Sequence, residues 1–315
     1  PSPQFIPIPG VPSDTAVGTG AVAVNGSAAF GDTAIATGTN STAVGAYASA
    51  TGTYSLASGA GADAYGFFST AVGAYTTAND SSSAFGTAAA ATGSASTAVG
   101  NGATALGDSS SAIGTTSLAD GAGAQALGAS SSATDAYATA VGFSAEATNA
   151  YATATGAQSL ASGYSSTATG AYSESSGIGS TATGAFAVAN AQYASATGYG
   201  ASATGYASTA TGYSAVASGE SSVAMGDSAE ATGNFSSASG FQSFADSDFA
   251  TASGANSSAL GQDATATGAY SLAGDAESTA TGAHSSAIDG STASGYNSLA
   301  SYGGIFHRNV LSSGV

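Results

Sequence analysis

The chain has 315 residues, of which 43% are hydrophobic and only 6% are charged, with 46 Gly, one Lys or Arg in total and a formal net charge of −17. A chain with almost no cation cannot neutralise a nucleic-acid backbone, and an anionic membrane surface would repel it. The absence of Cys excludes disulfides, thiolate nucleophiles and Cys metal sites, and is consistent with an extracellular protein.

The first ten residues, PSPQFIPIPG, are rich in Pro and carry the apolar side chains Phe5, Ile6 and Ile8. They lack the basic start of a signal peptide, and no apolar run in the chain reaches the ~18 residues of a membrane span. We predict an extended N-terminal segment over residues 1–14 that docks on a partner through these three side chains.

A turn residue then recurs every seven residues through most of the chain. Steps of seven from Gly86 reach 30 positions, of which 24 are Gly, and four of the six exceptions are Asp or Asn. Because these residues tolerate positive φ best, we interpret the position as a tight turn. An earlier register runs from Gly31 to Asp80, and one residue is dropped before Gly86 and again before Gly295.

The residue two positions before each turn is almost invariant. It is Ala at all 38 turns of the two registers except at Ser175. A position restricted to Ala faces a space with no room for more, and the alternating Thr-, Ser- and Val-rich residues between turns are typical of a short strand. Two strands and two turns make a 14-residue coil. Residues 15–302 are therefore predicted to form an all-β parallel solenoid, or β-roll, of about 20 coils around an Ala core.

Three other architectures fit the repeat less well. A helix in a coiled coil would lose roughly 1 kcal/mol per Gly, and the large a and d residues and the e and g charges are absent. Gly- and Ser-rich disorder does not produce a strict repeat with 43% hydrophobic residues. Collagen needs Gly at every third residue and much Pro, whereas this chain has five Pro.

The two strands of each coil differ in the residues that flank the Ala. One set is uncharged throughout, whereas the other carries six acidic residues between Asp63 and Asp246. A thin roll cannot bury an outer sheet face by itself, so we predict that the uncharged sheet packs against further copies of the chain. The predicted oligomer interface consists of Val44, Val72, Phe85, Val99, Ile113, Leu127, Val141, Thr155, Thr169, Thr183, Thr211 and Met225.

The repeats STAVGAYASATG (41–52), STAVGNGATALGDSSSAIG (96–114) and SSVAMGDSAEATG (221–233) resemble those of the YadA-like head of trimeric autotransporter adhesins. The resemblance covers nearly the whole chain. It implies a left-handed β-roll, a homotrimer with the charge-free strands along its axis, and an adhesive head held off a bacterial outer membrane. Between Thr153 and Thr211 this strand carries Thr where the family usually has Val or Ile. We expect an extracellular head, on a bacterial surface or in a secreted filament, that binds a protein, glycan or abiotic surface.

No catalytic or cofactor site can be assembled from the sequence. His284 and His307 stand in different contexts with one Arg and no Cys, so neither a nucleophile triad nor a metal pair is formed. The acidic residues never form the Gly-Gly-x-Gly-x-Asp pattern of calcium-binding rolls. We expect a non-enzymatic protein with no cofactor, no bound metal and no nucleic-acid partner.

Two further functions stay open. Thr-Ala-Thr triplets recur at multiples of 14 residues from Thr153 to Thr279 and would form a plane resembling the ice-binding face of antifreeze solenoids. A structural filament is the other, because the C-terminal segment 303–315 offers Ile305 and Phe306 for docking on a neighbour. Many of the 15 Tyr follow a turn, where they would either stack between coils or anchor a ligand.

Overall fold

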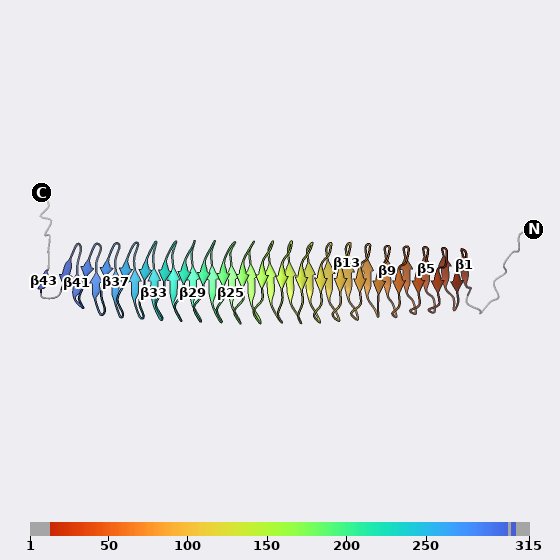
Figure 1. The fold of residues 1–315 in the computed structure, drawn as a ribbon, viewed down its shortest axis with the longest axis horizontal. Helices are drawn as coiled ribbons and strands as arrows, with labels where there is room; N and C mark the ends of the chain where they lie inside the picture. Colours follow the sequence, from red (N-terminus) through yellow and green to blue (C-terminus); the bar gives the residue numbers. More distant parts are fainter. Residues whose placement is uncertain (1–12, 302–303, 307–315) are drawn as a thin grey trace, which may run out of the picture. The chain divides into compact units, whose positions relative to one another are not determined.

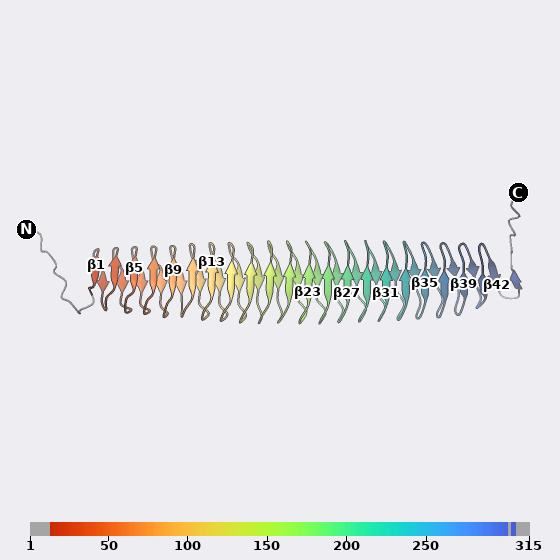
Figure 2. The ribbon, with the colours of Figure 1, turned by 180° about the vertical axis from the view of Figure 1, so that it is seen from behind.

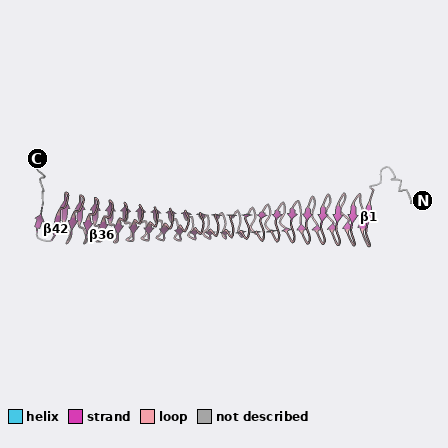
Figure 3. Cartoon of the chain, turned by 90° about the horizontal axis from the view of Figure 1, so that it is seen from above, coloured by secondary structure: helices cyan, strands magenta, loops and turns pink. Residues whose placement is uncertain are grey.

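The computed structural model describes residues 13–301 and 304–306. The chain divides into two compact units, Pro1–Ala152 and Thr153–Val315, here called unit 1 and unit 2. In each unit short strands alternate with tight turns, and the described residues contain no helix (Figure 1, Figure 3). The predicted all-β class is confirmed, whereas the division into two units was not predicted.

In unit 1 each three-residue strand pairs in parallel with the next three-residue strand along the chain, and this ladder is called sheet A. The two-residue strands between them pair in the same way and form sheet B. Sheet A of unit 1 contains β1 (Thr15–Val17), β3 (Ala28–Phe30), β5 (Thr42–Val44), β7 (Leu56–Ser58), β9 (Thr70–Val72), β11 (Ser83–Phe85), β13 (Thr97–Val99), β15 (Ser111–Ile113), β17 (Gln125–Leu127) and β19 (Thr139–Val141). Sheet B of unit 1 contains β2 (Val22–Ala23), β4 (Ile35–Ala36), β6 (Ser49–Ala50), β8 (Asp63–Ala64), β10 (Thr77–Ala78), β12 (Ala90–Ala91), β14 (Thr104–Ala105), β16 (Leu118–Ala119), β18 (Ser132–Ala133) and β20 (Glu146–Ala147).

Unit 2 repeats this arrangement, and Figure 2 shows its strands following one another in chain order. Its sheet A contains β21 (Thr153–Thr155), β23 (Thr167–Thr169), β25 (Thr181–Thr183), β27 (Ser195–Thr197), β29 (Thr209–Thr211), β31 (Val223–Met225), β33 (Ser237–Ser239), β35 (Thr251–Ser253), β37 (Thr265–Thr267), β39 (Thr279–Thr281) and β41 (Thr292–Ser294). Its sheet B contains β22 (Leu160–Ala161), β24 (Glu174–Ser175), β26 (Val188–Ala189), β28 (Ser202–Ala203), β30 (Val216–Ala217), β32 (Glu230–Ala231), β34 (Phe244–Ala245), β36 (Ser258–Ala259), β38 (Leu272–Ala273), β40 (Ser286–Ala287) and β42 (Leu299–Ser301).

One strand of each sheet and two turns make a coil. Unit 1 has ten such coils and unit 2 has eleven, which confirms the predicted two-strand coil and the number of about 20. Within each sheet the register pairs Ala with Ala, as in Ala168 with Ala182. The strand Ala residues that make up the core are almost all fully buried, as the Ala repeat predicts.

A second buried position, three residues after the turn residue, was missed by the sequence analysis. It carries Ser, Ala or Thr, and its side chain lies beside the strand Ala in the core. After the turns from sheet A to sheet B these Ser hydroxyls donate to the turn carbonyl, as Ser173 does to Gly170 at 2.9 Å. After the opposite turns several buried hydroxyls have no hydrogen-bond partner among the described residues, including Ser96 and Ser166. The Ser hydroxyls of the first kind therefore stabilise their turns, since a buried polar group needs a partner.

The two turns of each coil differ in backbone conformation. In the turn from sheet A to sheet B the residue after the strand has φ between +114° and +146° and is always Gly, because larger residues rarely adopt this region. In the opposite turn the equivalent Gly, such as Gly52, lies outside the left-handed region. Non-Gly residues occur only in this second turn, and among them only Asn25 and Asp289 have positive φ. Our interpretation that Asp and Asn stand there because of positive φ is wrong for Asp80, Asp135, Asn149 and Asp275.

Shortened turns explain the breaks in the repeat. The turns from sheet B to sheet A at residues 79–81 and 288–290 are one residue shorter than the others. Asp289 and Gly290 have φ of 55° and 68°, and Asn25 and Gly26, in a third short turn, have 63° and 77°. Two successive left-handed residues of the Asn-Gly or Asp-Gly type are characteristic of a type I′ turn.

The chain reverses direction after the last coil. β43 (Gly304–Phe306) pairs antiparallel with β42, whereas the other strands within each unit pair in parallel with their neighbours. Of the predicted docking residues, Phe5, Ile6 and Ile8 lie outside the described residues, and Ile305 and Phe306 belong to β43, whose backbone alone is described. Their docking role stays a prediction. Among the described residues, none forms a helix that could cross a membrane.

The difference between the two turns can be tested with two Gly substitutions in unit 2. A Cβ at Gly212 would lie 2.2 Å from the carbonyl oxygen of Gly226, and Gly212 has φ of +138°. We expect Gly212→Ala to cost about 2 kcal/mol or more, since it combines backbone strain with a clash. Gly219→Ala also meets a carbonyl oxygen at 2.0 Å, but without positive φ and at a position where Ala191 already stands. The melting temperature should therefore fall less for Gly219→Ala, and equal losses would contradict this account.

The narrow core can be tested at Ala168, which is fully buried. We expect Ala168→Leu to destabilise the chain by roughly 1–3 kcal/mol, because its larger side chain cannot be packed without moving the backbone. Ser202→Leu is the control. Ser202 points outward from sheet B at the position where Leu160 stands in another coil. The melting temperature of the Ser202→Leu variant should therefore hardly differ from that of the wild type.

Candidate functional site

The twelve residues of the predicted oligomer interface share one structural position. Each is the last residue of a sheet A strand, and its side chain points away from the Ala core. In unit 1 they run from Val44 on β5 to Val141 on β19, and in unit 2 from Thr155 on β21 to Met225 on β31. Two further apolar members of the same column, Val17 and Phe30, were missed, although their place in the repeat could have revealed them. The role of this column as an interface stays a prediction.

The chemistry of this column changes at the boundary between the two units. In unit 1 it is apolar in nine of ten strands, and Ser58 is the exception. In unit 2 it carries Thr or Ser in ten of eleven strands, and Met225 is the exception. The last member of unit 1 is Val141 and the first member of unit 2 is Thr155. Sheet A thus has an apolar outer face in unit 1 and a hydroxyl-rich outer face in unit 2.

Sheet A carries no charged side chain on its strands in either unit, whereas sheet B carries the acidic ones. Asp63, Glu146, Glu174 and Glu230 each begin a strand of sheet B. On sheet A of unit 1, Val44 and Phe85 are each 40% exposed and Ile113 is 44% exposed. Removing side chains of this kind from water lowers the free energy, and large exposed apolar patches are typical of interaction surfaces.

Aromatic side chains at the turns stack on those of the next coil, 14 residues away. Tyr172 and Phe186 have ring centroids 5.1 Å apart and planes inclined by 2°. Tyr54 with Phe68, Tyr137 with Tyr151, Tyr199 with Tyr213, Phe235 with Phe249 and Tyr270 with His284 are stacked in the same way. Stacking of this kind contributes about 0.5–1.5 kcal/mol per pair beyond burial. The structure thus shows stacking between coils for these rings, whereas anchoring of a ligand by the Tyr residues stays a prediction.

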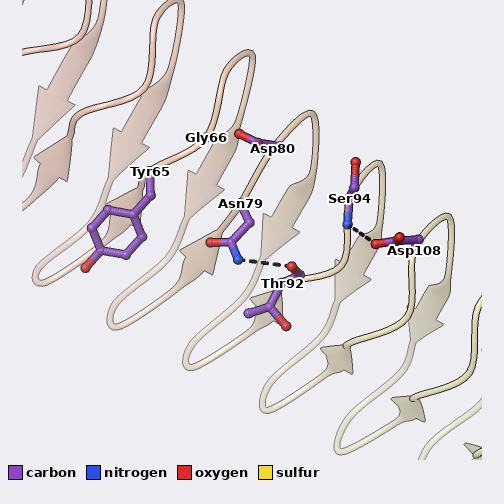
Figure 4. A pocket seen from close by; sticks show the side chains of 7 residues that line it. All are labelled: Tyr65, Gly66, Asn79, Asp80, Thr92, Ser94 and Asp108. Carbon is purple, nitrogen blue, oxygen red and sulfur yellow. Dashed lines mark hydrogen bonds between the residues drawn. The ribbon is translucent and has the colours of Figure 1, made fainter.

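Polar side chains line a shallow open cavity of about 420 Å³ along the turns from sheet B to sheet A in unit 1 (Figure 4). Asn79 donates to the carbonyl oxygen of Thr92 at 3.0 Å, and Asp108 accepts from the backbone N–H of Ser94 at 2.9 Å. Each bond joins two successive coils. The side chains therefore satisfy backbone groups that the parallel ladder leaves free at the turns. Within the described part of the chain, no three His, Cys, Asp or Glu side chains are grouped so that they could hold a metal ion.

Tyr65, at one end of this cavity, has a perturbed hydroxyl. Burial raises its pKa above the ordinary value of 10.0, and the Asp63 carboxylate raises it further by accepting a hydrogen bond and by repelling the phenolate. The phenol is therefore neutral at physiological pH. In this neutral state the Tyr65 hydroxyl donates its hydrogen bond to the Asp63 carboxylate.

These features define a β-solenoid repeat protein, built from 14-residue coils around an Ala core and with charged strand residues on only one of its two sheets. The chain matches the family model of the YadA head domain repeat in two-copy segments that together cover well over half of it, at residues 25–48, 50–76, 78–103, 91–117, 105–131, 147–173, 175–201, 203–229, 217–243, 231–257 and 252–273. It therefore belongs to the YadA head domain family. No curated protein is similar enough in sequence to count as a relative.

Membership confirms the resemblance seen in the three repeats and the expectation of a non-enzymatic adhesin domain. YadA head domains are surface-exposed parts of bacterial trimeric autotransporter adhesins.

Proposed function

We propose that this chain is the head of a trimeric adhesin in which three copies pack through the outer faces of their sheets A. The single observation that carries the proposal is the complete absence of charge on the strands of sheet A in a chain with 18 acidic residues. Sheet B also contributes one strand to each coil, and it carries several of those acidic residues on its strands. A difference of this kind between two faces of one thin roll is expected when only one of them is covered.

The apolar column of unit 1 supplies the larger share of the association free energy in this proposal. Its Val, Ile, Leu and Phe side chains are partly exposed, so burying each would contribute on the order of 1 kcal/mol. Nine of them per copy would contribute roughly 9 kcal/mol, which is comparable to the association cost of about 4–15 kcal/mol. The Thr and Ser column of unit 2 adds short hydroxyl side chains that can be buried only with hydrogen-bond partners or retained water.

Sheet B and the turns then face outward and meet the ligand. Their acidic side chains keep the head soluble and give it a negative surface. We propose that the head binds an extracellular protein, a glycan or an abiotic surface from a bacterial cell surface or a secreted filament. A left-handed roll with the charge-free strands along the trimer axis, as the resemblance implies, is part of the same proposal.

An ice-binding face is the second candidate, and one observation favours it. On sheet A of unit 2, Thr153 and Thr155 are in register with Thr167 and Thr169, and these pair in turn with the next Thr strand. The result is two straight columns of hydroxyl and methyl groups at the ~4.8 Å spacing of neighbouring strands. Such a face would have to be exposed to water, so this candidate excludes burial of sheet A in unit 2.

Three Lys substitutions distinguish these functions. We expect Val99→Lys to abolish the trimer, because each interface would bury an unpaired cation beside its symmetry copies. Thr167→Lys, on sheet A of unit 2, should weaken the trimer less. Glu174→Lys, on sheet B, should leave the mass unchanged, since exposed charge substitutions usually change stability by less than about 0.5 kcal/mol.

The measurement is the solution mass by sedimentation equilibrium, with circular dichroism as the check that each variant is folded. Equal masses for the wild type and all three variants would defeat the proposal that sheet A is an interface. A monomeric wild type whose thermal hysteresis activity is lost in Thr167→Lys would support the ice-binding candidate instead.

A further inference from the structure

The outer face of sheet B in unit 2 carries a pattern with twice the period of the coil. The first residue of its successive strands is alternately apolar and polar, without exception from β22 to β42. The register pairs Leu160 with Glu174 and Glu174 with Val188, so that apolar side chains on every second strand form one straight column. We call this column the comb, and its members are Leu160, Val188, Val216, Phe244, Leu272 and Leu299. The strands between them begin with Glu174, Ser202, Glu230, Ser258 and Ser286.

The comb is a property of unit 2 alone. The same position on sheet B of unit 1 does not keep the alternation: Ser49, Asp63 and Thr77 stand on three successive strands and are all polar. The comb side chains up to Leu272 are half-buried and Leu299 is 53% exposed, so their outer parts reach solvent. Neither the Ala core nor the pairing of strands requires the alternation, because the core depends on the inward side chains and the pairing depends on backbone hydrogen bonds.

The spacing of the comb fits one kind of chain. Neighbouring strands are ~4.8 Å apart, so the comb presents an apolar side chain every ~9.6 Å. A polyproline II helix has three residues per turn and rises ~3.1 Å per residue, so side chains three residues apart lie on one face at intervals of ~9.3 Å. An extended strand repeats every ~6.8 Å on one face and an α-helix every ~5.4 Å per turn, and neither matches.

The N-terminal segment of this chain has the matching period. In PSPQFIPIPGVP, Phe5, Ile8 and Val11 are each three residues apart, and five of the twelve residues are Pro. Pro-rich segments favour the polyproline II conformation, which places these three side chains in one row. The mismatch of ~0.3 Å per turn amounts to less than ~1 Å over three contacts. Phe5, Ile8 and Val11 can therefore meet three successive comb residues.

Charge and reach favour the comb of a second copy. The twelve residues carry no charged side chain, so the segment avoids the repulsion that a chain of net charge −17 imposes on other contacts between copies. Twelve residues span at most ~43 Å when fully extended. The nine steps from β1 to β19 along unit 1 already take about 43 Å at ~4.8 Å each. The segment, which joins the chain just before β1, is too short to run past its own unit 1.

We propose that the Pro-rich segment 1–12 of one copy docks as a polyproline II helix on the comb of unit 2 in a second copy, and so links copies into a larger assembly. The segment adds no strand to either sheet, and the main contacts are Phe5, Ile8 and Val11 against comb residues such as Val188, Val216 and Phe244. The inference does not depend on the trimer, because sheets A and B present opposite faces of the same coil.

The test compares substitutions on and off the two rows in the full-length chain. Ile8→Ser removes a side chain from the matching row, and Ile6→Ser removes an identical side chain from the same segment outside that row. The inference thus departs from the earlier prediction that Ile6 takes part in docking. The triple variant Val188→Ser, Val216→Ser and Phe244→Ser interrupts the comb with a residue that Ser202 and Ser258 show to be tolerated at this position. Leu118→Ser, at the equivalent position on sheet B of unit 1, is its control. Sedimentation velocity over a range of concentrations measures association beyond the basic oligomer.

We expect deletion of residues 1–12 and the triple comb variant to abolish this association. Ile8→Ser should raise the concentration needed for it at least tenfold, and Ile6→Ser and Leu118→Ser should leave it unchanged. A synthetic peptide of residues 1–12 should compete with it. The proposal is overturned if the wild type does not associate beyond its basic oligomer, if Ile6→Ser weakens association as much as Ile8→Ser, or if the comb variant associates normally. An unchanged basic oligomer in all variants separates this result from a failure of the sheet A interface.

Discussion

The contact between the two Ala-lined sheets is the constraint on which the rest of the structure depends. Because the strand residue that faces the interior is Ala, the two sheets of each unit lie very close together, and the chain must return after only a few residues. Such a return requires a turn conformation that a Cβ would obstruct, and Gly therefore stands in every turn from sheet A to sheet B. The single Ser in the Ala position, Ser175, is accommodated because its hydroxyl bonds to the buried Ser180 hydroxyl at 2.6 Å.

A core this thin buries little apolar surface per coil, so the ladder between coils carries much of the stability. Within each unit, neighbouring coils contact one another through parallel strands, turn hydrogen bonds and stacked rings such as those of Tyr199 and Tyr213. Stability in such a solenoid is nearly a sum of identical neighbour terms. The outward side chains contribute little to that sum, and so they are free to differ between the two sheets and between the two units.

The sequence predicted the inward half of the structure well and the outward half only in part. Periodicity identifies Ala43 and Gly45 as core and turn, because every coil imposes the same steric requirement on them. It separates the two sheets by charge, because Glu174 and Thr167 occupy alternate heptads. It did not reveal the buried position of Ser173, because Ser is as common on the surface as in this core. The difference between the two turns was missed as well, since both contain Gly.

The period of the comb shows why a coil-by-coil analysis overlooks some surfaces. A search for a 14-residue repeat averages Val188 with Ser202 and Val216 with Glu230, and the result is an ordinary mixed surface. The alternation is visible only when strands are compared two at a time. A ligand whose own repeat is about twice the spacing of the strands would contact every second strand. A solenoid can therefore carry two surfaces of different period on opposite faces of one coil. Sheet A repeats with every strand and suits identical neighbours, whereas sheet B in unit 2 repeats with every second strand and suits a helical chain with a longer rise per turn.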